Sequence, residues 1–305
     1  MDVLIFMVSG TFAAATALIF AAMGELVAEK SGMLNLGIEG MMATGAAMGF
    51  VASYVSGSYT VGFLAGALLG CLLSLVHATL ILVFRANQTA SGLAIGILGL
   101  GLSSAIGKNF ESRTFPGVPD LPLGPLADIP VIGPMFFQLD AMVYLSMLLI
   151  PATWYVLNRT KLGLTIRAVG ESPENAHALG LKVRIVRAAC VAFGGAMAGI
   201  GGAYMSTAYT PLWADGMIAG RGWIVVALTV FGTWMVHRVA FGAYLFGSVT
   251  LLELSIQAFG VNVPSQLMSA LPYIVTIVML AAISRNATFI RLNSPASLGA
   301  DLKLP

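Results

Sequence analysis

The sequence is a succession of long apolar runs separated by short polar segments. A helix that crosses a bilayer needs roughly 20 apolar residues, and several runs meet or approach this length. The candidate spans are 3–23, 33–55, 61–84, 91–107, 138–157, 187–209, 222–236, 239–258 and 265–284. The seventh is short and the fourth is rich in glycine, so either can be a broken or re-entrant helix buried in protein. The pattern predicts an all-α transmembrane bundle of about nine spans, between roughly eight and ten, as one domain over residues 1–305.

Composition supports a membrane protein and excludes an ordinary soluble enzyme. Of the 305 residues 58% are hydrophobic and only 9% are charged, whereas a soluble domain carries about 25% charged residues. The net charge of +2 is too small and dispersed to indicate a nucleic-acid partner. Cys71 and Cys190 lie in apolar runs, so neither a disulfide framework nor a cysteine metal site is expected. No basic segment precedes the first run, which we expect to remain as an anchor.

The loop 158–187 sets the expected orientation. Its basic residues are Arg159, Lys161, Arg167, Lys182, Arg184 and Arg187. Under the positive-inside rule this loop is cytoplasmic. Alternation of nine spans then places 24–32 and the C-terminus in the cytoplasm and the N-terminus outside, with twelve of the fifteen basic residues on the inner face.

The predicted outer loop 108–137 holds six of the thirteen prolines. Because proline lacks the amide donor of a long helix or a central strand, this loop is expected to be a stiff, irregular cap. Whether it is a spacer or a docking surface for a partner stays open at this point.

Glycines recur at four-residue spacing within the predicted spans. They form the series Gly62/Gly66/Gly70, Gly45/Gly49, Gly92/Gly96 and Gly195/Gly199. Small residues four apart give a flat helix face on which two backbones approach closely in lipid. We interpret these glycines as helix-packing positions.

Enzyme chemistry is poorly supported. The stretch 101–109 approximates a phosphate-binding loop, yet Asn109 stands where the motif needs a hydroxyl and no strand precedes it. No histidine pair has zinc-site spacing, so no catalytic or metal site is predicted.

The acids expected inside spans are Glu39 and Glu253, and an ionisable group there is a functional hypothesis by default. Glu39 either hydrogen-bonds a helix break, pairs with Lys30 or serves transport. Glu253 with Gln257 either joins two helices or lines a pathway.

A short capped helix is predicted in the cytoplasmic loop. Ser172 suits the N-cap, Pro173 the first helical position, Glu174 the positive helix end and Gly180 the left-handed position after the helix. A helix of about two turns is marginal alone, so its caps indicate that it docks into another protein. The alternative is a helix lying on the membrane surface.

This loop and several further stretches resemble one family, the integral-membrane permease subunits of bacterial ABC importers for simple sugars, nucleosides and branched-chain amino acids. The further stretches are 29–42 (EKSGMLNLGIEGMM), 85–89 (RANQT), 220–224 (GRGWI), 231–234 (FGTW) and 271–273 (LPY). The run Asn-Leu-Gly-Ile-Glu-Gly-Met-Met and the chain length look most like the shorter permease of nucleoside-type systems. The resemblance implies that the loop 158–187 carries a coupling helix, which inserts into an ATPase subunit. The matching positions are Arg167, Ala168, Gly170, Glu171, Ser172, Asn175, Ala176 and Gly180.

The resemblance also implies the partners and location of this chain. They are a separate ABC ATPase that uses the ATP, a second and different permease, an extracytoplasmic solute-binding protein, and the lipid bilayer of a bacterial cytoplasmic (inner) membrane. No cofactor is expected on this chain itself. The low charge favours a neutral solute such as a nucleoside, with a simple sugar or a branched-chain amino acid as alternatives. The residues expected to include pathway groups are Asn35, Glu39, Asn87, Gln88, Trp223, Trp234 and Gln257. The rival from another class is an ion-coupled secondary transporter that uses Glu39 or Glu253.

Overall fold

The computed structural model describes residues 2–258, 270–271, 274–275, 277–278, 281 and 293–300, and the side chains of 2, 3, 253, 254, 257 and 258 lie outside that description. The α-helices are α1 (Asp2–Lys30), α2 (Ile38–Ser56), α3 (Tyr59–Leu82), α4 (Gln88–Gly107), α5 (Ala141–Arg159), α6 (Lys161–Glu171), α7 (Pro173–Ala178), α8 (Val183–Tyr204), α9 (Arg221–Phe231) and α10 (Val236–Ala258). Shorter helical turns are η1 (Lys108–Phe110), η2 (Gly124–Asp128), η3 (Gly133–Phe137) and η4 (Met205–Tyr209). The strands β1 (Asp120–Pro122) and β2 (Gln138–Asp140) pair antiparallel, with Asp120 opposite Asp140.

Within the described residues, five helices are long and apolar enough to cross a membrane. They are Leu4–Lys30, Tyr59–Leu82, Gln88–Phe110, Ala141–Arg159 and Val183–Tyr209, and shorter apolar helices cover Arg221–Phe231 and Val236–Leu252. The chain is therefore a multi-pass helical membrane protein. Most of the predicted span 265–284 lies outside the described residues, so the number of about nine stays a prediction.

The structure distinguishes the two segments that the sequence allowed to be broken, the fourth and the seventh. The glycine-rich segment 91–107 is continuous within α4, a regular helix of 20 residues. The segment 222–236 is broken: α9 has 11 residues, which at 1.5 Å per residue gives a length of about 16 Å, roughly half of a bilayer core. The prediction of a broken helix is therefore confirmed for the seventh segment and not for the fourth.

The first connection also differs from the sequence prediction. The segment 24–32, predicted to be a cytoplasmic loop, continues α1 as far as Lys30. The next span was expected from residue 33, but α2 begins at Ile38, and residues 31–37 form an irregular connector. Polar side chains interrupt the apolar run here, and hydrogen bonds within the fold offset the cost of burying them.

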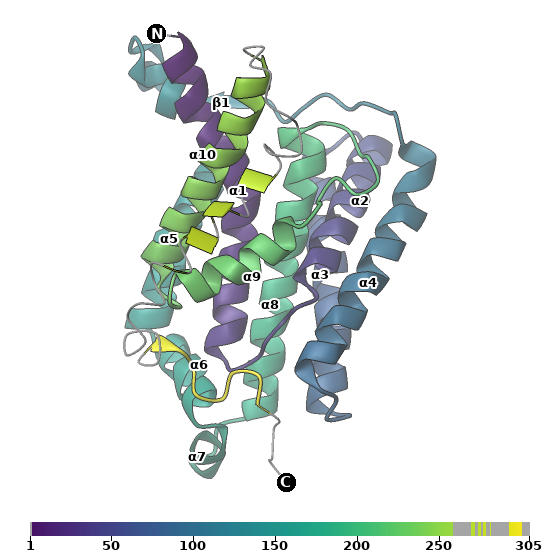
Figure 1. Ribbon diagram of the computed structural model, residues 1–305, viewed down its shortest axis with the longest axis vertical. Helices are drawn as coiled ribbons and strands as arrows, with labels where there is room; N and C mark the ends of the chain where they lie inside the picture. The colour runs from purple at the N-terminus through teal and green to yellow at the C-terminus, as the bar shows by residue number, and fades with distance from the viewer. Residues whose placement is uncertain are drawn as a thin grey trace.

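Helix α2 lies at the centre of the bundle, packed against α3, α4, α8 and α9, while α1 packs against α5, α8, α9 and α10 (Figure 1). Most of α2 is buried. The buried residues of α2 include Glu39, Thr44 and Ser53 and several glycines, which lower the hydropathy of this helix.

Glycine sets the closeness of these contacts. A Cβ atom at Gly70 would clash with the carbonyl oxygen of Gly195, and one at Gly199 would clash with that of Gly66. The backbones of α3 and α8 therefore touch directly. This arrangement confirms the interpretation of the four-residue glycine spacing as helix packing.

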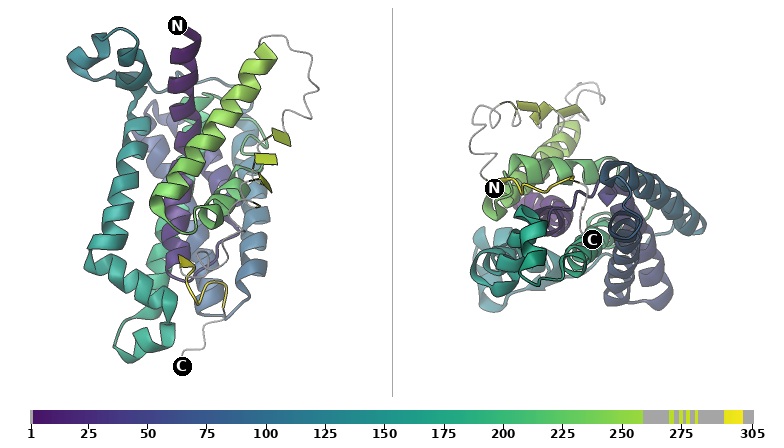
Figure 2. Two further views of the ribbon diagram at one scale, coloured as in Figure 1. Left: turned by 60° about the vertical axis from the view of Figure 1, so that its left-hand side comes forward. Right: turned by 90° about the horizontal axis from the view of Figure 1, so that it is seen from below.

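The two ends of the bundle differ in structure. One end carries the start of α1 and the loop 108–137, which consists of short turns and the strand β1 that pairs with β2; the other carries α6, α7 and residues 293–300 (Figures 1 and 2). Residues 108–137 contain no α-helix, as the prolines predict. The basic loop 158–187 forms the second end, which we call the coupling end after the coupling helix that the family resemblance predicts there.

Candidate functional site: a half-length helix between two buried carboxylates

The connector 31–37 is held by side chains from three helices. Gln88 Oε1 accepts a hydrogen bond from the Leu34 amide at 2.8 Å, and His77 Nε2 lies 3.2 Å from the Leu34 carbonyl oxygen. The Asn35 amide donates to Glu25 Oε1 at 3.3 Å. Irregular backbone inside a membrane bundle needs such partners, because lipid offers none. These bonds fix the point where α1 ends and α2 begins.

The start of α9 is bound by Glu39. The Gly220 amide donates to Glu39 Oε1 and the Gly222 amide to Glu39 Oε2, each at 2.6 Å. Gly220 has φ +85°, a left-handed conformation that suits glycine and turns the chain into the helix. A buried carboxylate at a helix N-terminus satisfies free amides and interacts favourably with the helix dipole. Glu39 is thus the acid of a helix break.

The end of α9 is bound by Glu29. After α9 ends at Phe231, Thr233 and Trp234 adopt positive φ angles of 49° and 53°, which L-residues rarely do. This turn places the Trp234 indole against α1, where Nε1 donates to Glu29 Oε2 at 2.5 Å. The half-length helix is therefore held at its start by α2 and at its end by α1.

A second acid lies one turn before Glu29. Glu25 and Glu29 are both fully buried, and one oxygen of each, Glu25 Oε2 and Glu29 Oε1, has no hydrogen-bond partner among the described residues. The prediction that Glu39 and Glu253 are the acids within spans was incomplete, because α1 extends through both positions. A segment with two acids directly after an apolar run has the low hydropathy that is typical of a loop. Only their four-residue spacing hinted at a continued helix.

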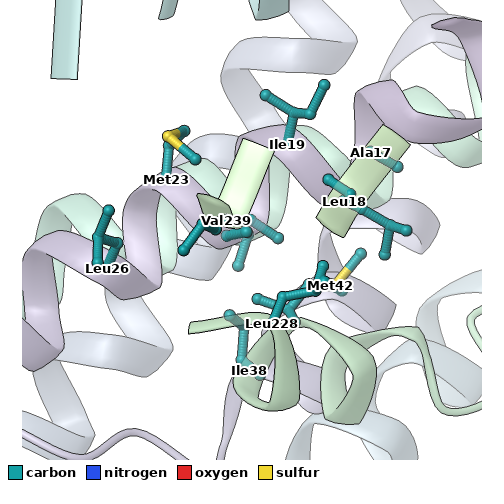
Figure 3. Close-up of a cluster of buried hydrophobic side chains, with 14 of the residues drawn as sticks. Ala17, Leu18, Ile19, Met23, Leu26, Ile38, Met42, Leu228 and Val239 are labelled. Carbon is teal, nitrogen blue, oxygen red and sulfur yellow. The ribbon is translucent and has the colours of Figure 1, made fainter. Parts of the chain in front are cut away.

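An apolar cluster fills the space around α9. Side chains from α1, α2, α9 and α10 meet there, as Figure 3 shows. Leu18, Met23, Ile38, Leu228 and Val239 are among its buried members. The polar contacts at the two ends of α9 are thus separated by close packing, so a displacement of α9 must also move its neighbours.

The coupling end contains a helical hairpin, α6 followed by α7. Ser172 caps α7, accepting a hydrogen bond from the Asn175 amide at 3.4 Å, and Gly180 has φ +83° after the helix. The capped short helix predicted from the sequence is therefore present. Ala176 is buried against the bundle, whereas Leu179 at the tip is 80% exposed. This tip is the part of the hairpin available to another protein.

The base of the hairpin is attached to the bundle through residues 293–300. Ser297 Oγ donates to the Gly170 carbonyl oxygen at 2.6 Å and accepts from Arg187 Nη2 at 2.7 Å. Arg187 Nε also donates to the Ser31 carbonyl oxygen at 3.1 Å. A Cβ atom at Gly170 would clash with the carbonyl oxygen of Lys30. The last turn of α6 therefore contacts the connector almost directly.

A polar cavity of about 380 Å³ lies between this hairpin and the end of α9. Its lining includes Lys30, Arg167, Glu171 and Trp234. Lys30 Nζ donates to the Asn293 carbonyl oxygen at 2.9 Å, whereas the two Glu39 oxygens accept from the Gly220 and Gly222 amides. Arg167 and Glu171, two of the predicted coupling residues, thus lie beside the turn that ends α9.

The predicted pathway residues divide into three groups. Asn35, Glu39 and Trp234 come together around the connector and α9, where all three are buried. Asn87 caps α4 by accepting from the Ala90 amide at 3.0 Å, and the neighbouring Gln88 is buried against Leu34. In this conformation these five side chains bind other parts of the chain, and their contact with solute stays a prediction.

The other two pathway residues stand apart. Trp223 on α9 is 45% exposed. Gln257 belongs to the last turn of α10, as Glu253 does to the turn before it, but both side chains lie outside the described residues. Their roles stay predictions.

The fold and this site define a multi-pass membrane protein with a discontinuous helix in its core and a capped hairpin at its basic end. Residues 3–280 match the family of the branched-chain amino acid transport system permease component. The chain belongs to this family of ABC transporter permeases.

Individual relatives extend over nearly the whole chain. A putative glucose ABC transporter permease, TsgC13 of Haloferax volcanii, is 39% identical, covering 96% of this chain and 95% of the relative. The nucleoside ABC transporter permease NupC of Lactococcus lactis is 34% identical over 87% of this chain and 88% of its own. The guanosine ABC transporter permease NupQ of Bacillus subtilis is 32% identical over 92% of both chains. Sugar and nucleoside permeases are thus both among the relatives.

Proposed function

We propose that this chain forms the solute pathway of an ATP-driven importer, as one of two permease subunits. A separate ATPase drives it and an extracytoplasmic binding protein delivers solute. The proposal places the coupling end in the cytoplasm of a bacterial cell and the N-terminus outside, because the basic loop 158–187 lies at that end. The second permease is a different chain in this scheme.

The coupling role rests on one observation, that the base of the hairpin α6–α7 contacts the connector 31–37. Gly170 contacts the connector, and the cavity beside Arg167 and Glu171 reaches Trp234, the residue that binds Glu29 at the end of α9. A movement of the hairpin therefore acts first on the connector and on α9. In this mechanism ATP binding in the partner biases the position of a half-length helix that has two arrangements.

A neutral solute, a nucleoside first, fits the proposal best. A cavity of about 520 Å³ lies between α4, α2 and the loop 210–220. Among the described residues, no Lys or Arg side chain lines this cavity, so it offers no cation to the carboxylate of a branched-chain amino acid. A simple sugar is the second candidate, because the glucose permease above has the highest identity of the three relatives described.

An ion-coupled secondary transporter is less well supported. Glu39 is a poor coupling acid for such a transporter, because both of its oxygens already accept backbone hydrogen bonds, although Glu25 and Glu29 each keep one oxygen without a hydrogen-bond partner among the described residues. That mechanism also gives no role to the exposed, capped tip of the hairpin.

The coupling role is tested with Leu179→Ser, co-expressed with the candidate ATPase and the partner permease. Burial of one leucine side chain contributes about 1.5–3 kcal/mol, so we expect the ATPase to bind roughly 10- to 100-fold more weakly. Val83→Ser is the matched control, since Val83 is 66% exposed near the coupling end but outside the hairpin. Equal ATPase binding by both variants would contradict the coupling role of the hairpin tip.

A further inference from the structure

A cavity of about 520 Å³ lies in the outer half of the bundle, between α4, α2 and the loop 210–220 that precedes α9. Its lining is Ala43, Ile97, Leu100, Gly101, Ser103, Ser104, Ala214, Asp215, Gly216, Met217 and Ile218. None of these residues was among the sequence-predicted pathway groups. The lining of the cavity ends at Ile218, three residues before α9 begins at Arg221.

Asp215 supplies the charge in this cavity. Its Oδ1 accepts from Ser104 Oγ at 2.6 Å and from the Gly216 amide at 3.1 Å. No residue in the described part of the chain donates to its Oδ2, and Asp215 is exposed. Asp215 therefore has one oxygen fixed by the protein and one available to a ligand hydroxyl.

The walls of the cavity leave room beside this carboxylate. A Cβ atom added at Gly101 or at Gly216 would have no neighbour within 4 Å. Ile97, Leu100 and Met217 provide apolar surface next to the open space. A few polar groups set in an apolar wall are typical of a small-molecule site.

The loop that carries Asp215 is fixed at both ends. Trp213, two residues before it, is buried and packs against Gly107 of α4. Gly220, five residues after it, donates its amide to Glu39. Occupancy of the cavity can therefore act on the start of α9 through a short, anchored segment.

We propose that this cavity binds a neutral ring-bearing solute through adjacent hydroxyl groups donated to Asp215. The inference rests on the proposed function and names the chemical class of its solute. A carboxylate that accepts from hydroxyls forms short, charge-assisted hydrogen bonds, and a carboxylate binds ribose hydroxyls in this manner in dinucleotide sites. Nucleosides and monosaccharides share adjacent ring hydroxyls, whereas branched-chain amino acids have none.

The test is protection of an introduced cysteine from a membrane-impermeant thiol reagent added to the outer face of vesicles. The vesicles contain the complete transporter without ATP, and Gly101→Cys is introduced after Cys71 and Cys190 are replaced by alanine. Glu111→Cys is the control, because Glu111 is exposed in the outer loop 108–137 and does not line the cavity. We expect guanosine or glucose to slow labelling of the Gly101→Cys transporter and to leave labelling of the Glu111→Cys transporter unaffected.

Comparison of solutes identifies the source of the hydroxyls. Protection by guanosine but not by 2′,3′-dideoxyguanosine assigns the site to a ribonucleoside, and protection by glucose alone assigns it to a monosaccharide. Protection by leucine equal to that by either, or by no solute at all, overturns the proposal.

Asp215→Asn separates the role of the carboxylate from that of the cavity. The amide keeps the shape but loses the charge-assisted bond, so half-protection should need roughly tenfold more solute. Asp128→Asn, an exposed acid in the loop 108–137, should leave protection unchanged. Unchanged protection in Asp215→Asn overturns the assignment. Because the assay uses no ATP, its result is independent of the ATPase-binding test with Leu179→Ser.

Discussion

Glu39→Gln is the most informative single change in the site. Gln keeps one acceptor oxygen but turns an NH₂ group toward either the Gly220 or the Gly222 amide. One hydrogen bond to a charged group, worth about 1.5–3 kcal/mol, is lost, and a buried amide is left unsatisfied at a further cost of about 1–3 kcal/mol. Partial relaxation of the residues around the substitution reduces the sum of these two contributions. We therefore expect the free energy of unfolding to fall by roughly 2–5 kcal/mol.

The effect is measured as the thermal denaturation midpoint of the purified chain in detergent. At roughly 2 °C per kcal/mol for a chain of this size, Glu39→Gln should lower the midpoint by about 4–10 °C. Glu111→Gln is the control, because Glu111 is exposed beside the outer loop, and it should change the midpoint by less than about 1 °C. A midpoint for Glu39→Gln equal to that of the control would refute the view that this carboxylate holds the start of α9.

Three further tests, the first with a matched control, address other parts of the structure. Gly199→Ala places a methyl group against the Gly66 backbone and should destabilise by about 1–3 kcal/mol in thermal denaturation, whereas Gly101→Ala, in open space, should be neutral or stabilise by up to roughly 1 kcal/mol. Ser297→Ala removes the hydrogen bond to the Gly170 carbonyl oxygen at the hairpin base and leaves Arg187 with one partner fewer. ATP-dependent uptake should therefore fall several-fold while ATPase binding is retained. Unchanged uptake would contradict the role of Ser297 in attaching the hairpin to the bundle. Trp234→Phe removes the donor to Glu29 and should lower the denaturation midpoint by the equivalent of about 1–3 kcal/mol, and a midpoint equal to wild type would argue against that contact.

Periodicity and composition identified the membrane bundle and the glycine contacts because those properties repeat along the chain. The capped helix α7 was also predictable, since Ser172 and Gly180 act locally. The family resemblance extended the prediction to the whole chain. In contrast, the connector 31–37 lay within segments that hydropathy assigned to a loop and a span.

The site itself depends on long-range contacts, which sequence patterns do not encode. Glu39 binds amides 181 and 183 residues away, and Glu29 binds an indole 205 residues away. Glu39 was singled out because an acid in a span is conspicuous, while Glu29 was missed because it follows an apolar run. Asp215 was not singled out from the sequence, because its neighbour Ser104 is 111 residues distant.

The most direct test of the central claim is uptake of radiolabelled guanosine by vesicles containing this chain with its partner permease, ATPase and binding protein. The account predicts uptake that needs ATP and every partner, and that proceeds without an ion gradient. Uptake by this chain alone, driven by a proton or sodium gradient without ATP, would contradict the account.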